Sequence, residues 1–126
     1  MNRQLINSGS IFEEQVSFSR AVVVDKMVFV SGCTGYDYAT NIIDDDIVAQ
    51  TEQTFKNIEN ALTKAGASFK DIVRVNYILK DTDEWERCWP IFKKYLGDVC
   101  PACTVICAKL TGEKLKIEIE VTAIKQ

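Results

Sequence analysis

The chain has 126 residues, 47% hydrophobic and 26% charged, a size that suits one globular domain with a single core and is too short for two. A formal net charge of −3 argues against a dedicated nucleic-acid-binding protein, which would be basic with clustered Lys and Arg. The sequence holds no histidine, which excludes the commonest zinc ligand and the Ser-His and Cys-His catalytic pairs. Any chemistry must therefore come from carboxylates, thiols, hydroxyls, Lys, Arg or the backbone.

The sequence shows no basic-plus-apolar leader and no apolar run of about 18 residues, so we expect a cytoplasmic protein with no membrane partner. In a reducing compartment, its five cysteines are expected to be buried apolar residues or free thiols rather than a disulfide framework. Their odd number supports this expectation, because one cysteine would be left over.

The first two runs of β-branched and aromatic residues predict a β-hairpin. Residues 16–24 and 27–33 are separated only by Asp25 and Lys26, a gap that suits a tight turn. Gly32 and Gly35 then end the second strand in a loop that runs to about residue 41.

The acidic triplet at residues 44–46 suggests either a metal site or a helix cap. The next residues carry an apolar stripe at helical spacing, and Gly66 is a natural stop after it. Aspartates before such a helix satisfy its free N–H groups and match the positive end of its dipole. Capping is therefore the favoured interpretation.

The rest of the chain predicts a strand at 71–79, a second helix at 83–97, and strands at about 102–109 and 115–124. Pro90 should either bend the second helix or lie near its first turns. The order β-β-α-β-α-β-β predicts a single α+β domain over residues 1–126, with two helices packed on one face of a mixed sheet.

Cysteines 100, 103 and 107 fall within eight positions and raise the possibility of a redox dithiol or a zinc site. A redox Cys-x-x-Cys pair relies on a helix N-terminus after a strand, whereas this one follows a helix and precedes a strand. On a strand, Cys103 and Cys107 would lie about 13 Å apart, too far to ligate one zinc ion together. We expect no joint function, no metal and no cofactor.

The ordered segments resemble the RidA/YjgF family over nearly the full chain. "FSRAVVVDKMVFVSGCTG" (18–35) resembles the family's Y-S-Q-A-V…G…V-F-V-S-G-Q. "QTEQTFKNIENALTKAGASFKDIVRVNYIL" (50–79) resembles Q-T…N-I…L…A-G…D-V-V-K. "CPACTVICAKLTGEKLKIEIEVTAI" (100–124) resembles P-A-R-[ST]…V…L-P…V-E-I-E-x-x-A. The resemblance implies a chorismate-mutase-like fold, a homotrimer, and hydrolysis of enamines and imines such as 2-aminoacrylate and 2-iminopropionate.

The P-A-R arginine is implied to clamp the substrate carboxylate in a cleft between subunits, and here that position is Cys103. A guanidinium makes two parallel charge-assisted bonds to a carboxylate, and a neutral thiol cannot replace them. The resemblance therefore indicates a divergent member that lacks the substrate-binding arginine.

Other implied pocket positions also differ from the family pattern. Phe18 stands in place of the tyrosine, Cys33 in place of the glutamine after S-G, and Trp89 at the place of an asparagine. Ser31 and Gly32 are retained as backbone shapers of the pocket.

Glu120, the second glutamate of E-I-E, is retained too, and its implied role is to hold the attacking water or a proton. Without the resemblance, Glu120 would be interpreted as a solvated strand carboxylate. In the more apolar pocket implied here, we expect the pKa of this carboxyl to be raised.

The sequence thus predicts a RidA-family homotrimer that binds a small, weakly charged or uncarboxylated metabolite between subunits. A diverged hydrolase with Glu120 as general base, or with a nucleophilic Cys103 assisted by Glu120, stays open. The alternatives are a non-catalytic ligand sensor or trimeric interaction module, and an RNA-directed translation inhibitor or endoribonuclease. The acidic balance makes a nucleic-acid partner the weakest of these.

Overall fold

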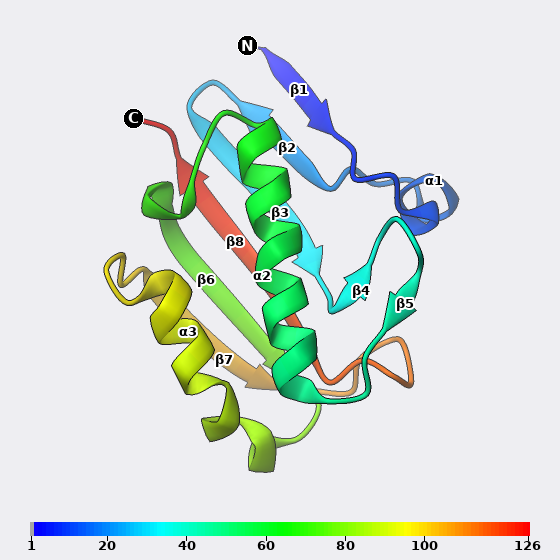
Figure 1. Ribbon diagram of the computed structural model, residues 1–126. Helices are drawn as coiled ribbons and strands as arrows, with labels where there is room; N and C mark the ends of the chain where they lie inside the picture. The colour runs from blue at the N-terminus through cyan, green and yellow to red at the C-terminus, as the bar shows by residue number, and fades with distance from the viewer. Residues whose placement is uncertain (1) are drawn as a thin grey trace.

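The computed structural model describes residues 2–126 as a twisted mixed sheet with helices on one face (Figure 1). The sheet has strand order β1-β2-β3-β8-β6-β7, and β6 and β7 form its parallel pair. The elements of the sheet layer and its helices are β1 (Arg3–Ile6), α1 (Ile11–Val16), β2 (Ala21–Val24), β3 (Met27–Cys33), α2 (Ile47–Lys64), β6 (Ile72–Leu79), α3 (Trp89–Leu96), β7 (Ala102–Cys107) and β8 (Ile117–Ile124). A small hairpin of β4 (Tyr36–Asp37) and β5 (Ile42–Ile43) and the 3-10 turns η1 (Phe69–Asp71), η2 (Thr82–Glu84) and η3 (Glu86–Cys88) complete the chain.

The predicted α+β class and the packing of the two main helices on one sheet face are confirmed. The predicted hairpin is also present: Val24 pairs with Met27, so Asp25 and Lys26 form a two-residue turn. Asp25 has φ 53°, a left-handed conformation that Asp tolerates better than most residues.

The N-terminal part of the chain differs from the prediction. The first strand does not run from residue 16, because residues 11–16 form α1 and β2 begins at Ala21. Ser10 caps α1 by accepting the N–H of Phe12, and Ser17 ends it with φ 68°. Strand β1 and the β4–β5 hairpin were not predicted, since two to four residues are too few to show a periodic pattern.

The long helix agrees closely with its prediction. The side chain of Asp46 accepts the N–H groups of Val48 and Ala49, so the acidic residue before α2 is a cap. Gly66 follows the helix with φ 82°. The stripe predicted to face the core is buried throughout: Ile47, Thr51, Phe55, Ile58, Leu62 and Ala65.

The predicted helix 83–97 is shorter and broken in the structure. The turns η2 and η3 precede α3, which begins at Trp89 with Pro90 in its first turn. Proline has no N–H to donate, and the first turn is where a helix does not need one. Of the two possibilities for Pro90, the position near the first turn is therefore confirmed.

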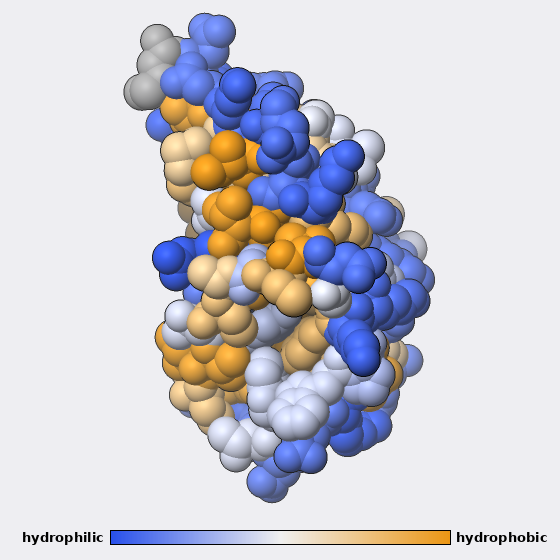
Figure 2. All heavy atoms as spheres, turned by 90° about the vertical axis from the view of Figure 1, so that its left-hand side faces the viewer, coloured by the Kyte–Doolittle hydropathy of each residue, from blue (hydrophilic) through white to orange (hydrophobic). Residues whose placement is uncertain are grey.

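The two faces of the sheet differ in what covers them. On β8, Ile117, Ile119, Val121 and Ala123 point toward α2 and are buried, while Glu118, Glu120, Thr122 and Ile124 alternate with them on the outer face. No described element covers the outer face, and Met27, Phe29, Ile106 and Ile124 on it are each 40–50% exposed. Figure 2 views the molecule from the left-hand side of Figure 1. Apolar side chains gather along the left of this view, whereas hydrophilic side chains dominate its right. None of the described helices is long and apolar enough to cross a membrane.

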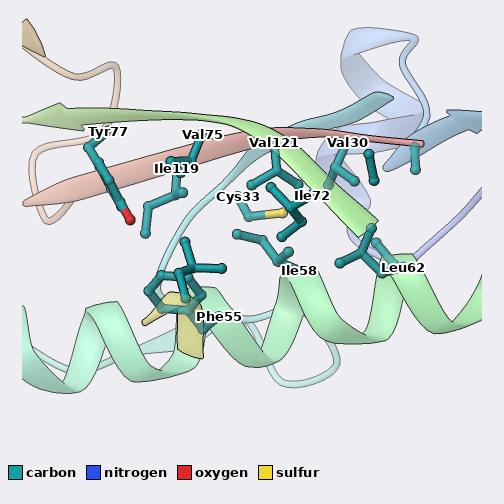
Figure 3. Close-up of a cluster of buried hydrophobic side chains, with 14 of the residues drawn as sticks. Val30, Cys33, Phe55, Ile58, Leu62, Ile72, Val75, Tyr77, Ile119 and Val121 are labelled. Atoms are coloured by element: carbon teal, nitrogen blue, oxygen red, sulfur yellow. The ribbon is translucent and has the colours of Figure 1, made fainter. Parts of the chain in front are cut away.

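Phe55 is the centre of the contact between α2 and α3. Its ring is fully buried in the core (Figure 3). It stacks on Tyr95 at a centroid distance of 4.7 Å, and it also meets Phe69 and Phe92 edge-on, each at 6.2 Å. The contact between the helices is therefore aromatic, and it places the first turn of α3 beside the sheet.

We expect Phe55→Ala to lower the free energy of unfolding by about 3–5 kcal/mol, because it removes a buried ring from a cluster that cannot close around the cavity. Urea denaturation measures this loss. Ile42→Ala is the control, because Ile42 is 68% exposed and its truncation should change stability by no more than about 0.5 kcal/mol. A loss at Phe55 as small as that of the control would contradict the central role of the ring.

Candidate functional site

A β-bulge brings together three of the residues that the sequence predicts to line a pocket. Val30 pairs with Val121 and Cys33 with Ile119, so two residues of β3, Ser31 and Gly32, lie opposite the single residue Glu120 of β8. Bulges of this kind bend a strand and redirect its side chains. The hydroxyl of Ser31 donates to the carbonyl of Ser19 at 2.6 Å, which fixes the bulge to the segment before β2.

Phe18 joins this group from the segment between α1 and β2. It is 36% exposed and lines a groove of about 500 Å³ together with Ser31. The other lining residues are Arg3, Leu5, Glu13, Ser17, Ser19 and Val22. The groove therefore lies over the outer face of β1–β3, next to the bulge.

Beneath this groove, Arg20 is a buried cation with several partners. Its Nε lies 3.2 Å from a carboxylate oxygen of Glu13, and the two side chains are only 3% and 2% exposed. Its Nη1 donates to the carbonyl of Gly32 at 2.9 Å. The guanidinium carbon lies 4.3 Å from the ring centroid of Tyr38 and 5.3 Å from that of Phe18. Arg20 therefore holds the position of both Phe18 and the bulge.

Glu13 extends this network to the N-terminal segment. Its carboxylate accepts the backbone N–H of Ser8 at 2.8 Å and a short hydrogen bond from the Ser8 hydroxyl. A buried carboxylate needs such donors in addition to its cation. The loop before α1 is thus fastened to the same arginine as the bulge.

Glu120 is exposed on the outer face and is oriented by its neighbour on β6. Asn76 pairs with it across the strands and donates from Nδ2 to Oε1 at 2.7 Å. The second carboxylate oxygen remains available to a water or a ligand.

Glu118 lies two residues before Glu120 on the same face and is half-buried. Its carboxyl occupies the space that a side chain at position 32 would fill, so it is in close contact with Gly32. Burial raises the pKa of Glu118, the charge of Glu120 raises it further, and the charge of Arg20 opposes them. Glu118 thus adds to this group a carboxyl with a raised pKa, at a position that the sequence did not single out.

The structure does not bring Cys103 to Glu120 within the chain. Cys103 pairs with Val75 across the parallel strands, so its side chain lies on the helix-facing side of the sheet, opposite to Glu120. Burial raises the pKa of the Tyr77 phenol, and the negative charge of the nearby Cys103 thiolate raises it further. Partial burial raises the pKa of the Cys103 thiol itself, which is the reverse of what a cysteine nucleophile requires.

Trp89 is also remote from the bulge. It begins α3, is 49% exposed, and lies with that helix at the same end of the sheet as β7 (Figure 1). Of the predicted site residues, Phe18, Ser31, Gly32 and Glu120 therefore lie near one another, whereas Cys103 and Trp89 both lie away from them on the helix side of the sheet.

Residues 9–125 match the family described as Endoribonuclease L-PSP. The chain belongs to this family, the RidA/YjgF family. It is 32% identical to a RutC family protein of Pyrococcus abyssi over 86% of this chain and 87% of that protein. It is 28% identical to a human 2-iminobutanoate/2-iminopropanoate deaminase over 86% of this chain and 80% of that protein.

Solved structures give the same result. A YjgF/YER057c/UK114 family member from Mycobacterium tuberculosis aligns with a TM-score of 0.89 and 34% identity over 98% of this chain and 99% of that one. RidA from a Psychrobacter species aligns with a TM-score of 0.81 and 30% identity over 86% and 88% of the two chains. The predicted family and its chorismate-mutase-like fold are thus confirmed for this RidA/YjgF protein.

Cys33 belongs to the core of this RidA/YjgF protein. Its side chain is fully buried and lies among Ile58, Ile72 and Val121 between the sheet and α2 (Figure 3). Burial raises the pKa of the thiol to about 11. Cys33 therefore does not line the groove, although it follows Ser31 and Gly32 directly. All five cysteines are free thiols, with 100, 103 and 107 exposed.

The sequence did not single out four residues of this site: Arg20, Glu13, Asn76 and Glu118. Arg20 is the one charge within the apolar run from 16 to 24, and a charge there is expected to be paired. That signal was available, but nothing in the sequence indicates that Glu13 is its partner. The role of Asn76 depends on strand register, which the sequence does not determine.

We expect Arg20→Met to lower the free energy of unfolding by about 3–5 kcal/mol, since it leaves the Glu13 carboxylate buried without its cation. Adding Glu13→Gln should recover part of this loss, because the uncompensated charge is removed. A double-mutant cycle in urea measures the coupling. Strictly additive losses would show that the two side chains do not depend on each other.

Proposed function

We propose that this RidA/YjgF protein binds a small, uncarboxylated or weakly charged metabolite in a cleft between subunits of a homotrimer and hydrolyses it with Glu120 as general base. One observation carries the proposal: Glu120 and Cys103 lie on opposite faces of one sheet. Glu120 of one subunit can meet Cys103, or Trp89 of α3, only if these come from another copy.

The outer face of the sheet supports an assembly of this kind. Met27, Phe29, Ile106 and Ile124 leave it apolar and uncovered by residues 2–126, and Figure 2 shows how the apolar atoms gather along this side. Exposed apolar side chains gathered on one face are typical of a protein–protein interface. Strand β7 also ends the sheet, with its outer edge unpaired among the described strands.

The arrangement around Glu120 suits the hydrolysis of a carbon–nitrogen double bond. With Asn76 holding one oxygen, the other can take a proton from a water that attacks the imine carbon. Addition of water and loss of the amine then give a carbonyl compound. The human and other mammalian relatives are named as deaminases of 2-iminobutanoate and 2-iminopropanoate, which are carboxylated imines. Cys103 offers no charge for such a carboxylate, so we propose a substrate without one.

We expect Cys103→Arg to raise kcat/KM for freshly generated 2-iminopropionate by about 100-fold, since it adds a charge-assisted clamp for the carboxylate. Cys107→Arg is the matched control, because position 107 lies on the same face of β7 four residues further on. Decay of the imine is followed by absorbance. Efficient turnover by the unmodified protein, or an equal gain in the control, would contradict the role assigned to Cys103.

A non-catalytic sensor or trimeric interaction module is the second candidate, favoured by the same apolar face. It would bind a ligand without turning it over, so a protein that hydrolyses neither carboxylated nor uncarboxylated imines would support it. RNA cleavage is suggested by the family description and by the name of a related structure, a putative endoribonuclease from Thermotoga maritima. The net charge of −3 does not favour it.

The trimer is tested separately by sedimentation. We expect Phe29→Glu to convert the trimer to monomer, because it puts a charge on the apolar outer face. Ile42→Glu is the control, since Ile42 is also exposed but lies in the β4–β5 hairpin away from this face. A protein that sediments as a monomer before any substitution would overturn the proposed cleft.

A further inference from the structure

We propose that Glu118 is a second catalytic carboxyl, which works with Glu120 as an acid–base pair beside Gly32 of the bulge. This inference deepens the proposed function and rests on it for the substrate, but the pair itself is a property of the described residues. Glu118 donates the proton that the nitrogen of a neutral imine needs, while Glu120 accepts one from water.

The placement of the two carboxyls follows from the strand. Residues two apart on a strand share a face and lie about 6.6 Å apart at Cα. The side chains of Glu118 and Glu120 therefore project from the same face of β8, and the bulge at Ser31 and Gly32 lies beside both.

The environments of the two carboxyls differ in the way that separate acid and base roles require. Glu120 is exposed and oriented by Asn76. Glu118 is half-buried, and among residues 2–126 no hydrogen bond or ion pair reaches its carboxyl. Because Gly32 has no side chain, the carboxyl can withdraw from water into the space above the backbone.

The groups that face Glu118 favour its neutral, proton-donating form. Ile78 pairs with it on β6 and Ile106 follows on β7, so apolar side chains flank it. The titratable groups near it are Arg20, Cys33 and Glu120. The positive charge of Arg20 is already engaged by Glu13 and by the carbonyl of Gly32.

The proton balance closes over both steps. Water forms a C–O bond to the imine carbon, the π electron pair moves to nitrogen with the proton of Glu118, and Glu120 takes a proton from the water. Glu118 then takes the hydroxyl proton of the carbinolamine, Glu120 returns its proton to the nitrogen, and the C–N bond breaks. The products are a carbonyl compound and an amine, and both carboxyls recover their starting states.

The pair is tested first without a substrate, by ¹³C NMR titration of the glutamate carboxyls, with the Glu118 signal assigned from Glu118→Gln. We expect Glu118 to titrate above the ordinary pKa of glutamate, and to titrate lower in Glu120→Gln, which removes the neighbouring charge. Gly32→Ala should also lower the pKa of Glu118, because the added methyl group expels the carboxyl into water. Glu59→Gln removes a charge elsewhere and should leave the titration unchanged. If Glu118 titrates at the ordinary pKa of glutamate and Glu120→Gln does not change this pKa, the proposal is overturned.

Stability gives an independent reading of the same ionisation. When folding raises the pKa of a carboxyl, the unfolded chain loses that proton at a lower pH than the folded protein does. The free energy of unfolding therefore falls as the pH rises above the pKa of the unfolded state. Glu118→Gln should therefore raise the unfolding temperature at pH 7 relative to the unmodified protein, and this gain should vanish below about pH 4. A gain that does not depend on pH would contradict the proposed state of Glu118.

Activity then separates this inference from the proposed function, with N-benzylidenemethylamine as a neutral imine followed by absorbance. The rate should fall as pH rises through the pKa of Glu118, and Glu118→Gln should lower kcat at least 100-fold and remove this limb of the profile. Hydrolysis with an unchanged rate and profile in Glu118→Gln would overturn the inference and leave the proposed function standing. Coupled titration without hydrolysis of any imine would overturn the proposed function and the catalytic role of Glu118 with it, and only the coupling between the two carboxyls would stand.

Discussion

The buried guanidinium of Arg20 is the interaction on which the site depends. Its contacts with Glu13, Gly32, Phe18 and Tyr38 bring together the loop before α1, the bulge of β3 and the loop after it. None of these segments has regular structure long enough to fix its own position. A cation taken out of water is stabilised only when its partners stay in place, so the arginine and the loops hold each other.

Above this cation, the sheet presents carboxyls in two environments. Asn76 keeps Glu120 in a fixed orientation in water, while Gly32 lets Glu118 leave water beside it. A half-buried carboxyl next to another one, with no partner among residues 2–126, lowers stability rather than adding to it. A feature that opposes folding in this way is more typical of a site than of a scaffold.

The sequence predicted the parts of the fold in which a residue pattern continues over many positions. The α2 stripe, the alternation on β8 and the family motifs extend over many residues, so each predicted its element or family correctly. The site was harder to predict, because it depends on one inserted residue. Without the bulge, Cys33 would share the outer face with Phe29 and Ser31. With it, the alternation changes and Cys33 turns into the core.

The side of the sheet that Cys103 faces was also hard to predict, because this residue lies on an edge strand. All six residues of β7 are exposed, so no pattern of burial indicates which of them face the helices. Only the register with β6 places Cys103 beside Val75 and thus on the side away from Glu120. Cys103 and Glu120 come from one short chain and are separated by the thickness of the sheet, so a site that held both of them would need a second copy of the chain. The residue at position 103 would then act on a substrate held by its neighbour, and the missing positive charge would change the specificity of a site to which it contributes only one wall.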